Sequence, residues 1–292
     1  MWGSENQKVI LRPIQLDSSQ GPLAIAMKHT VIVIPCFNEA RRLHGEAFLA
    51  FVASGHPQHF LFVNDGSTDD TARRLDELVA HVKQCRVLHL AANVGKAEAV
   101  RRGMLAALAE GAMRVGFLDA DLATPLEALP ELSSVLDARP DIDWVFGSRV
   151  QLLGRSIERR RARHYLGRIF ATVVSLVLRL PIYDTQCGAK LFRGTDELRH
   201  LLAEPFTAGW IFDVELIARL IQARRGTRLP PPDACIYELP LQAWRDVAGS
   251  KLRAKDFLRA ITDLANIRRR YGRLRSSSDA RRDSANARGD SR

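Results

Sequence analysis

The chain has 292 residues, of which 46% are hydrophobic and 26% charged, a globular composition that excludes a mostly disordered protein. Its four cysteines are widely spaced and form no CxxC pair, which excludes a disulfide scaffold and argues against a zinc site. The formal net charge is +10, but residues 1–150 carry a net −3 and residues 151–292 a net +13. This asymmetry indicates that the second half of the chain binds an anionic partner.

From residue 29 onward, short apolar runs alternate with helical segments. Residues 30–35 (TVIVIP) are typical of a buried parallel strand, and the Ser, Thr and Asp residues at 67–71 are typical of a helix start. The alternation predicts an α/β fold with a mostly parallel central sheet flanked by helices. We expect strands at 30–35, 59–65, 86–90, 114–118 and 143–146, and helices after residue 38, from 67–71 to about 83, at 95–109 and at 125–138.

The second half of the chain is more basic and contains two amphipathic stretches. Residues 149–168 hold seven arginines and one acid, and residues 169–178 are ten uncharged residues. The latter segment is either a buried core helix or a helix in a membrane interface, flanked by Arg163, Arg168 and Arg179. A second amphipathic stretch at about 251–271 carries basic residues along its length.

The termini differ in composition from the chain between them. We expect residues 1–28 to be a loose leader without a signal peptide and residues 29–272 to form one domain. We expect residues 273–292 to be a disordered basic tail. No apolar run reaches the roughly 18–20 residues that a membrane-spanning helix needs. We therefore expect a cytoplasmic protein that is soluble or peripheral on a membrane.

Acidic and amide side chains follow three of the expected strands. Asn38 and Glu39 follow the first strand, Asp65 ends the second, and Asp119 and Asp121 follow the fourth. Ligands of an open parallel sheet bind beyond the carboxyl ends of its strands. Residues two apart on an extended segment project to the same side, so both carboxylates of the DAD sequence can meet one Mg²⁺ or Mn²⁺ that also holds a diphosphate.

Two common phosphate-binding motifs are absent, since neither GxGxxG nor GxxxxGK[ST] occurs. Instead PCFNE at 35–39, VNDGSTDDT at 63–71, NVGK at 93–96 and DAD at 119–121 resemble the family 2 inverting glycosyltransferases, which have the GT-A fold. The sequences GSR at 147–149, DTQCGAKLF at 184–192, WIFDVEL at 210–216 and W…GSK at 244–251 resemble the dolichyl-phosphate β-glucosyltransferase group within that family.

This resemblance implies a donor site for a nucleotide sugar. Pro35, Asn38 and Glu39 would line the nucleoside pocket, and Asp65 would bind the base or ribose unless it only caps a turn. Lys96 would lie near the nucleotide or be a solvated lysine at a helix start. The resemblance assigns the metal and the diphosphate to Asp119 and Asp121.

It also implies a polyprenyl phosphate acceptor. Arg149 and one or more arginines within 159–163 would hold the acceptor phosphate. Asp184 and Asp213 would act as a base or orient the acceptor, or would only cap a helix or pair with nearby arginines. The resemblance implies transfer of glucose from UDP-glucose in a single inverting displacement.

Three alternatives remain open at this point. A GDP-mannose-dependent enzyme would share the strand-end motifs. A non-catalytic nucleotide-sugar-binding or membrane-surface module could keep the same fold, although the intact DAD sequence argues against it. The basic run could contact nucleic acid, but no nucleic-acid motif accompanies it, and an apolar segment beside it favours anionic lipid.

Overall fold

The computed structural model describes residues 29–80, 82–158, 161–247 and 254–272. The leader and the basic tail expected from the sequence lie outside these residues. So do Arg159 and Arg160, together with most of the segment that joins the last strand to the last helix.

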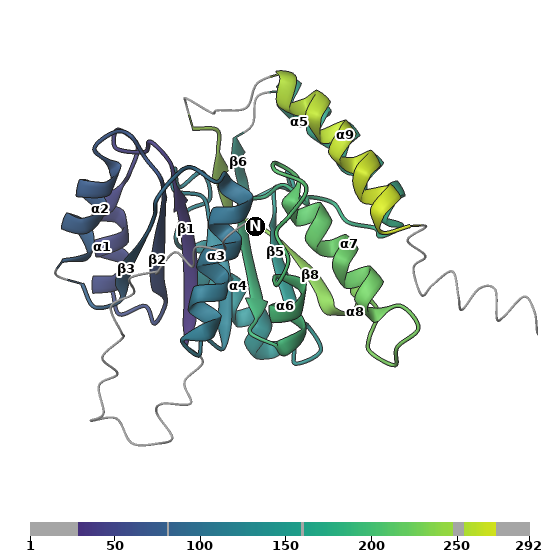
Figure 1. Ribbon diagram of the computed structural model, residues 1–292, viewed down its shortest axis with the longest axis horizontal. Helices are drawn as coiled ribbons and strands as arrows, with labels where there is room; N and C mark the ends of the chain where they lie inside the picture. Colours follow the sequence, from purple (N-terminus) through teal and green to yellow (C-terminus); the bar gives the residue numbers. More distant parts are fainter. Residues whose placement is uncertain (1–28, 81, 159–160, 248–253, 273–292) are drawn as a thin grey trace, which may run out of the picture.

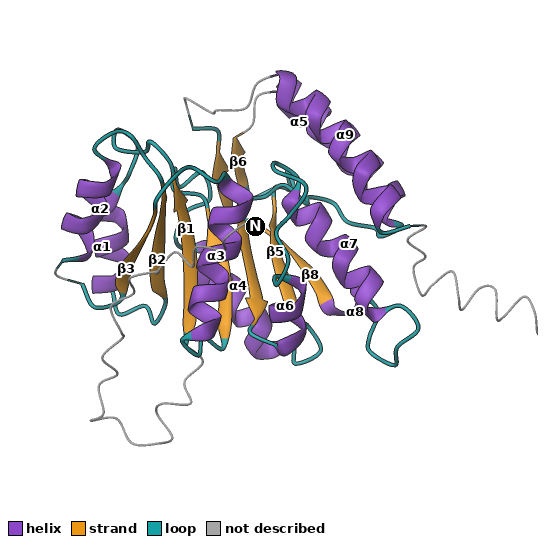
Figure 2. Cartoon of the chain, viewed as in Figure 1, coloured by secondary structure: helices purple, strands orange, loops and turns teal. Residues whose placement is uncertain are grey.

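A seven-stranded sheet forms the centre of the molecule, in the order β3-β2-β1-β4-β7-β5-β8. Figure 2 shows the strands in orange among the purple helices. Six of its strands run parallel, and β7 lies antiparallel between β4 and β5. A separate pair of short parallel strands is formed by β6 and β9. The strands are β1 Thr30–Cys36, β2 His59–Asp65, β3 Cys85–Leu90, β4 Arg114–Leu118, β5 Trp144–Ser148, β6 Ser156–Glu158, β7 Ala189–Arg193, β8 Ile236–Pro240 and β9 Ala243–Arg245.

Helices cover both faces of the sheet (Figure 1). Alternate residues of β1 show why, because Val31 and Val33 pack into the core beneath α3 and α7, whereas Ile32 and Ile34 pack with α1, α2 and α4. A strand buried on both faces is an apolar run without alternation. The helices are α1 Gly45–Ala53, α2 Thr71–Val79, α3 Lys96–Ala109, α4 Ala128–Ala138, α5 Arg161–Leu178, α6 Asp196–Leu201, α7 Phe212–Arg224, α8 Pro232–Cys235 and α9 Ala254–Arg270.

The architecture confirms the predicted fold class, and all five expected strands are present. The helix expected to reach about residue 83 ends at Val79 instead, because the chain turns there toward β3. The sequence analysis did not predict β7, β8, α6 or α7. The pattern of β7, AKLFR, includes a lysine that the structure buries, so it differs from the apolar runs of the parallel strands.

Helix α5 has two apolar faces. Phe170, Val174 and Leu178 lie in the core, whereas Ile169 and Leu176 are 60% and 72% exposed. The buried side agrees with the interpretation of residues 169–178 as a core helix, and the interpretation of the exposed side as a membrane interface stays a prediction. Within the described residues, no helix combines the length and the apolar character needed to cross a membrane.

Candidate functional site

The acidic pair after β4 lies beside the start of α3. The Nζ atom of Lys96 is 2.5 Å from Oδ1 of Asp119, and the side chain of Asp119 is 35% exposed. Oδ1 of Asp121 accepts a hydrogen bond from the backbone of Ala123 at 3.2 Å, which orients this carboxylate within the turn. The parallel β1–β4 pairing and the parallel β1–β2 pairing bring three strand ends to one edge, as the sequence predicted.

The charges of the pair are only partly balanced. Burial and the neighbouring charge of Asp119 raise the pKa of Asp121, although Arg42 and Lys96 act in the opposite direction. Burial would lower the pKa of Lys96, but the carboxylates of Asp119, Asp213 and Asp121 outweigh it and raise that pKa. Two carboxylates that keep negative charge beside Lys96 are suitable ligands for a divalent cation. Such an ion would reduce the repulsion between Asp119 and Asp121.

A diphosphate would have to complete the coordination of such an ion. Across the described ranges, no group of three or more His, Cys, Asp or Glu side chains is placed to hold a metal. Magnesium and manganese sites that bind nucleotides commonly use one or two carboxylates together with phosphate oxygens and water. The residues present therefore fit a metal that arrives with its ligand rather than a closed structural site.

Asp65 holds the turn that leads into α3. This residue is 2% exposed, and its carboxylate accepts hydrogen bonds from the backbone of Val94 at 2.7 Å, the backbone of Gly95 at 2.9 Å and the Asn93 amide at 3.1 Å. Gly95 has a φ of 88°, which suits glycine at this position. Asp65 thus positions Lys96, and its contact with a base or ribose stays a prediction.

The segment after β1 interlocks with the turn after β2. Asn38 has a φ of 51°, and its Oδ1 accepts from the backbone of Thr68 at 2.9 Å. Glu39 is 7% exposed and receives two hydrogen bonds from Arg42, at 2.8 and 2.6 Å. Pro35 is half-buried within β1. The structure therefore brings these residues to the predicted edge, while their contact with a nucleoside stays a prediction.

Arg149 lies at the end of β5 and pairs with Asp184. Its Nε and Nη2 atoms donate to the two carboxylate oxygens, each at 2.7 Å, and its guanidinium lies 5.2 Å from the ring centre of Trp244. Burial would raise the pKa of Asp184, but the charge and hydrogen bonds of Arg149 hold it at about 2. Asp184 is therefore an ionised partner of Arg149 rather than a base with a matched pKa.

Asp213 lies in the first turn of α7 and is also paired. Lys190 donates to its Oδ2 at 2.9 Å, and Gln186 donates to its Oδ1 at 2.8 Å. The sequence analysis singled out Asp213 but missed Lys190 and Gln186. Both lie in the DTQCGAKLF motif, but a motif does not show which of its members is buried.

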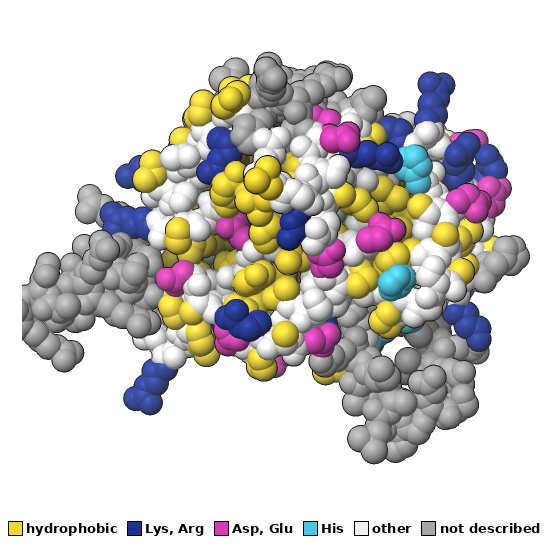
Figure 3. All heavy atoms as spheres, turned by 180° about the vertical axis from the view of Figure 1, so that it is seen from behind, with side chains coloured by type: hydrophobic (Ala, Val, Ile, Leu, Met, Phe, Trp, Pro, Cys, Tyr) yellow, Lys and Arg dark blue, Asp and Glu magenta, His cyan; other side chains and the backbone are white. Residues whose placement is uncertain are grey.

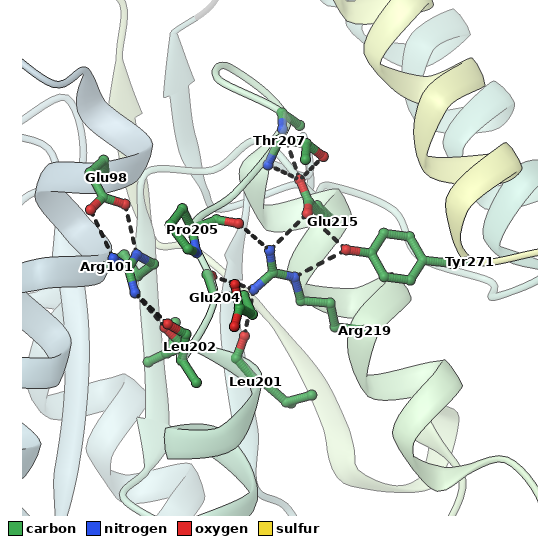
Figure 4. A network of polar contacts seen from close by, with 12 residues as sticks. Glu98, Arg101, Leu201, Leu202, Glu204, Pro205, Thr207, Glu215, Arg219 and Tyr271 are labelled. Atoms are coloured by element: carbon green, nitrogen blue, oxygen red, sulfur yellow. Dashed lines mark hydrogen bonds and ion pairs between the residues drawn. The ribbon is translucent and has the colours of Figure 1, made fainter. Parts of the chain in front are cut away.

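A polar network fixes α7, and with it Asp213, to the rest of the molecule (Figure 4). Glu215 is fully buried and accepts hydrogen bonds from the backbone of Thr207, from Arg219 and from the Tyr271 hydroxyl, each at 2.8 Å. Arg219 in turn donates to backbone carbonyls of the segment before α7. The network joins α7 to the residue that follows α9.

The arginines expected to hold an acceptor phosphate are only partly described. The side chains of Arg161 and Arg163 lie outside the described parts of the chain, like the whole of 159–160. Arg168 donates to the carbonyl of Tyr183 at 3.1 Å and lies over the ring of the same residue. The identity of the phosphate-binding arginine therefore stays a prediction.

A hollow of about 560 Å³ lies between α1, the turn after Asp121 and the β6–β9 pair. Its lining includes Phe51, Leu122 and Trp244, together with Glu127 and Arg245. The view from behind shows apolar side chains over the middle of the molecule with acidic and basic side chains among them (Figure 3). Leu122 directly follows Asp121 in the sequence, but neither Asp119 nor Asp121 lines the hollow.

Comparison with known proteins places this arrangement among glycosyltransferases. Residues 31–197 match glycosyl transferase family 2. A dolichyl-phosphate beta-glucosyltransferase of Trichomonas vaginalis is 30% identical over 251 residues, which cover 82% of this chain and 70% of the relative. The dolichyl-phosphate beta-glucosyltransferase of Saccharomyces cerevisiae is 30% identical over 261 residues, 82% of this chain and 74% of the relative.

Solved structures support the fold. Glucosyl-3-phosphoglycerate synthase of Mycobacterium tuberculosis in complex with UDP superposes with a TM-score of 0.57 at 23% identity, covering 84% of this chain and 82% of that one. A second structure of that enzyme holds Mn²⁺, UDP-glucose and phosphoglyceric acid, with a TM-score of 0.56 at 22% identity, covering 83% and 82%. This likeness confirms the expected GT-A architecture.

Proposed function

Because this chain belongs to glycosyl transferase family 2, we propose that it transfers glucose from UDP-glucose to a polyprenyl phosphate of the dolichyl type. The chain is a glycosyltransferase. The proposed substrates are based on its similarity to dolichyl-phosphate beta-glucosyltransferases over 82% of its length. The DTQCGAKLF motif, which resembles that group, lies beside the acidic pair, because the carbonyl of Gly188 accepts a hydrogen bond from the backbone of Asp119 at 3.1 Å.

On the donor side, Asp119 and Asp121 would hold Mg²⁺ or Mn²⁺ together with the diphosphate of the nucleotide sugar. The bound ion would supply charge stabilisation for the departing nucleoside diphosphate. Lys96 lies against Asp119 and would offset part of the same charge. Pro35, Asn38, Glu39 and Asp65 would form the nucleoside end of the site.

On the acceptor side, the attacking group is a phosphate oxygen. A phosphomonoester has a second pKa near 6 and is largely ionised at neutral pH, so the attack needs positioning more than a general base. The oxygen displaces the nucleoside diphosphate from the anomeric carbon, which inverts the configuration and gives a β-linked glucosyl lipid phosphate. This chemistry does not require Asp184 or Asp213 to accept a proton, which agrees with their places in ion pairs.

Arg149 would contribute to the acceptor site together with Asp184. A phosphate that approached this guanidinium would share it with the Asp184 carboxylate, which already accepts two hydrogen bonds from it. We therefore expect arginines further along the basic run to carry more of the phosphate charge. The planar fork of arginine suits that task.

The membrane surface would bind the outer face of α5. Ile169, Val173 and Leu176 are exposed on this face, although apolar side chains are usually buried in a soluble protein. Arg179 is exposed at the end of the same helix, and Arg268, Arg269 and Arg270 are exposed at the end of α9, which packs on α5. An apolar face beside basic residues favours an anionic lipid surface, such as the cytoplasmic leaflet of a membrane.

The proposed function is tested by donor binding and transfer. Calorimetric titrations with UDP-glucose and with GDP-mannose, each with and without Mn²⁺, identify the donor. Transfer to dolichyl or undecaprenyl phosphate is then followed with radiolabelled sugar, and NMR coupling constants assign the anomeric configuration. We expect binding of UDP-glucose that depends on Mn²⁺ and a β-linked product. Transfer from GDP-mannose instead, or an α-linked product, would contradict the proposal.

A further inference from the structure

Gly188 lies in the turn before β7, and the Asp119 carboxylate occupies the space where a side chain at position 188 would lie. A Cβ atom built on Gly188 would lie 2.2 Å from Oδ2 of Asp119 and 2.4 Å from its Cγ. Real Cβ atoms essentially never approach other atoms so closely. The backbone nitrogen of Asp119 also donates to the carbonyl of Gly188 at 3.1 Å, so a backbone hydrogen bond holds the two residues together.

The buried side chain of Lys190 stabilises the turn that contains Gly188. The side chain of Lys190 is fully buried, and its Nζ donates to the carbonyls of Thr185 at 2.8 Å and Cys187 at 2.6 Å. The same atom pairs with Asp213 at 2.9 Å and lies 5.2 Å from the ring centres of Phe117 and Phe146. A buried ammonium with all these partners fixes the turn, because any shift of the turn would leave the charge unpaired.

We propose that Gly188 is a positioning residue of the donor site, which sets the direction of the Asp119 carboxylate through the space that its missing side chain leaves. Gly188 itself touches neither donor nor acceptor. It acts on Asp119, which the turn directs toward Lys96 and toward the proposed diphosphate. This inference rests on the proposed function only in assigning the diphosphate to Asp119.

The structure indicates which group would yield if a side chain were added at position 188. The three atoms nearest to the added Cβ all belong to the carboxyl group of Asp119. That group is the end of a side chain that is 35% exposed, whereas the turn is fixed by Lys190. The carboxylate would therefore rotate away while the fold remained, so an added methyl group would impair donor binding much more than stability.

The test is the Gly188→Ala variant, with Gly209→Ala as the matched control. Gly209 has nothing within 4 Å of an added Cβ and no positive φ, so its substitution meets no steric conflict. Titration of UDP-glucose in the presence of Mn²⁺ should give a Kd for Gly188→Ala that is about 10–100-fold weaker than wild type, as for other changes that misorient a metal ligand. The control should bind like wild type. Without Mn²⁺ the three proteins should differ little.

Thermal unfolding of the same proteins completes the experiment. The melting temperature of Gly188→Ala should stay within about 4 °C of wild type. A wild-type Kd in Gly188→Ala would overturn the inference, and so would loss of the folded state, because the backbone would then have yielded rather than the carboxylate. A wild-type chain that binds GDP-mannose and not UDP-glucose would contradict the proposed donor alone, and the comparison would then be made with GDP-mannose. A wild-type chain that binds neither would contradict both proposals.

Discussion

The two sides of the site differ in how their charged side chains are paired and buried. On the side built by β1, β2 and β4, Asp65 bonds to backbone N–H groups, while the Asp119 side chain remains 35% exposed. On the side built by β5, β7 and α7, the charges pair with one another in buried contacts such as Arg149–Asp184 and Lys190–Asp213. The first side leaves Asp119 and Asp121 partly exposed to a ligand. We call the buried pairs of the second side, Arg149–Asp184 and Lys190–Asp213, the frame of the site.

The largest effect should follow from breaking the frame. Replacing Arg149 with Met leaves the buried Asp184 carboxylate without its cation, which typically costs about 3–5 kcal/mol of unfolding free energy. Urea denaturation measures this loss. The matched control is Arg139→Met, which breaks an arginine–aspartate pair whose side chains are 50% and 55% exposed, and should change stability far less. Equal losses in the two variants would remove the distinction between frame and surface.

The next largest effect concerns the half-buried carboxylates after β4. Asp121→Ala should lower the rate of transfer by on the order of 10²–10³, because charge stabilisation at the leaving diphosphate would be lost. The same variant should unfold at nearly the wild-type urea concentration, since the structure gives the carboxylate one local backbone contact. Asp233→Ala, an exposed acid on α8, serves as the control and should transfer at the wild-type rate. Near wild-type turnover in Asp121→Ala would contradict the metal assignment.

A smaller effect should appear on acidification of the frame. Arg149 holds the pKa of Asp184 at about 2, below its usual 3.8, so the stability due to this pair is complete above about pH 4 and is lost as the pH falls toward 2. A shift of this size corresponds to about 2 kcal/mol. The free-energy advantage of wild type over Asp184→Asn should therefore shrink between pH 5 and pH 2.5 in urea titrations. Parallel curves over this range would show that Asp184 does not titrate in this way.

The smallest effect should come from the outer face of α5. Changing Ile169, Val173 and Leu176 together to Ser should weaken binding to anionic vesicles by at least about tenfold, or about 1.4 kcal/mol. The melting temperature should change little, because these side chains are exposed. Val174→Ser is the contrasting control, since Val174 is fully buried and its change should lower the melting temperature. Unchanged vesicle binding by the triple variant would contradict the membrane assignment.

Much of the first half of the fold could be predicted from local patterns. The strands at residues 30–36, 59–65 and 114–118 are apolar and bounded by turns, so each indicates a buried strand without reference to the others. The second half was predicted less well. Strand β7 contains the buried Lys190, and α7 buries Asp213, Glu215 and Arg219. Charges at core positions obscure the periodicity on which such predictions depend.

The sequence by itself determined the family, the positions of five strands and the acidic residues at the ends of three of them, because these follow from motifs and from local apolar runs. Only the tertiary structure decided which charges are available to a ligand. Asp119 and Asp184 are both aspartates in motifs of the sequence, yet the side chain of Asp119 is 35% exposed beside Lys96, whereas Asp184 is buried against Arg149. Pairing across 35 residues, as between Arg149 and Asp184, depends on how distant strands approach one another, and no local pattern encodes that approach.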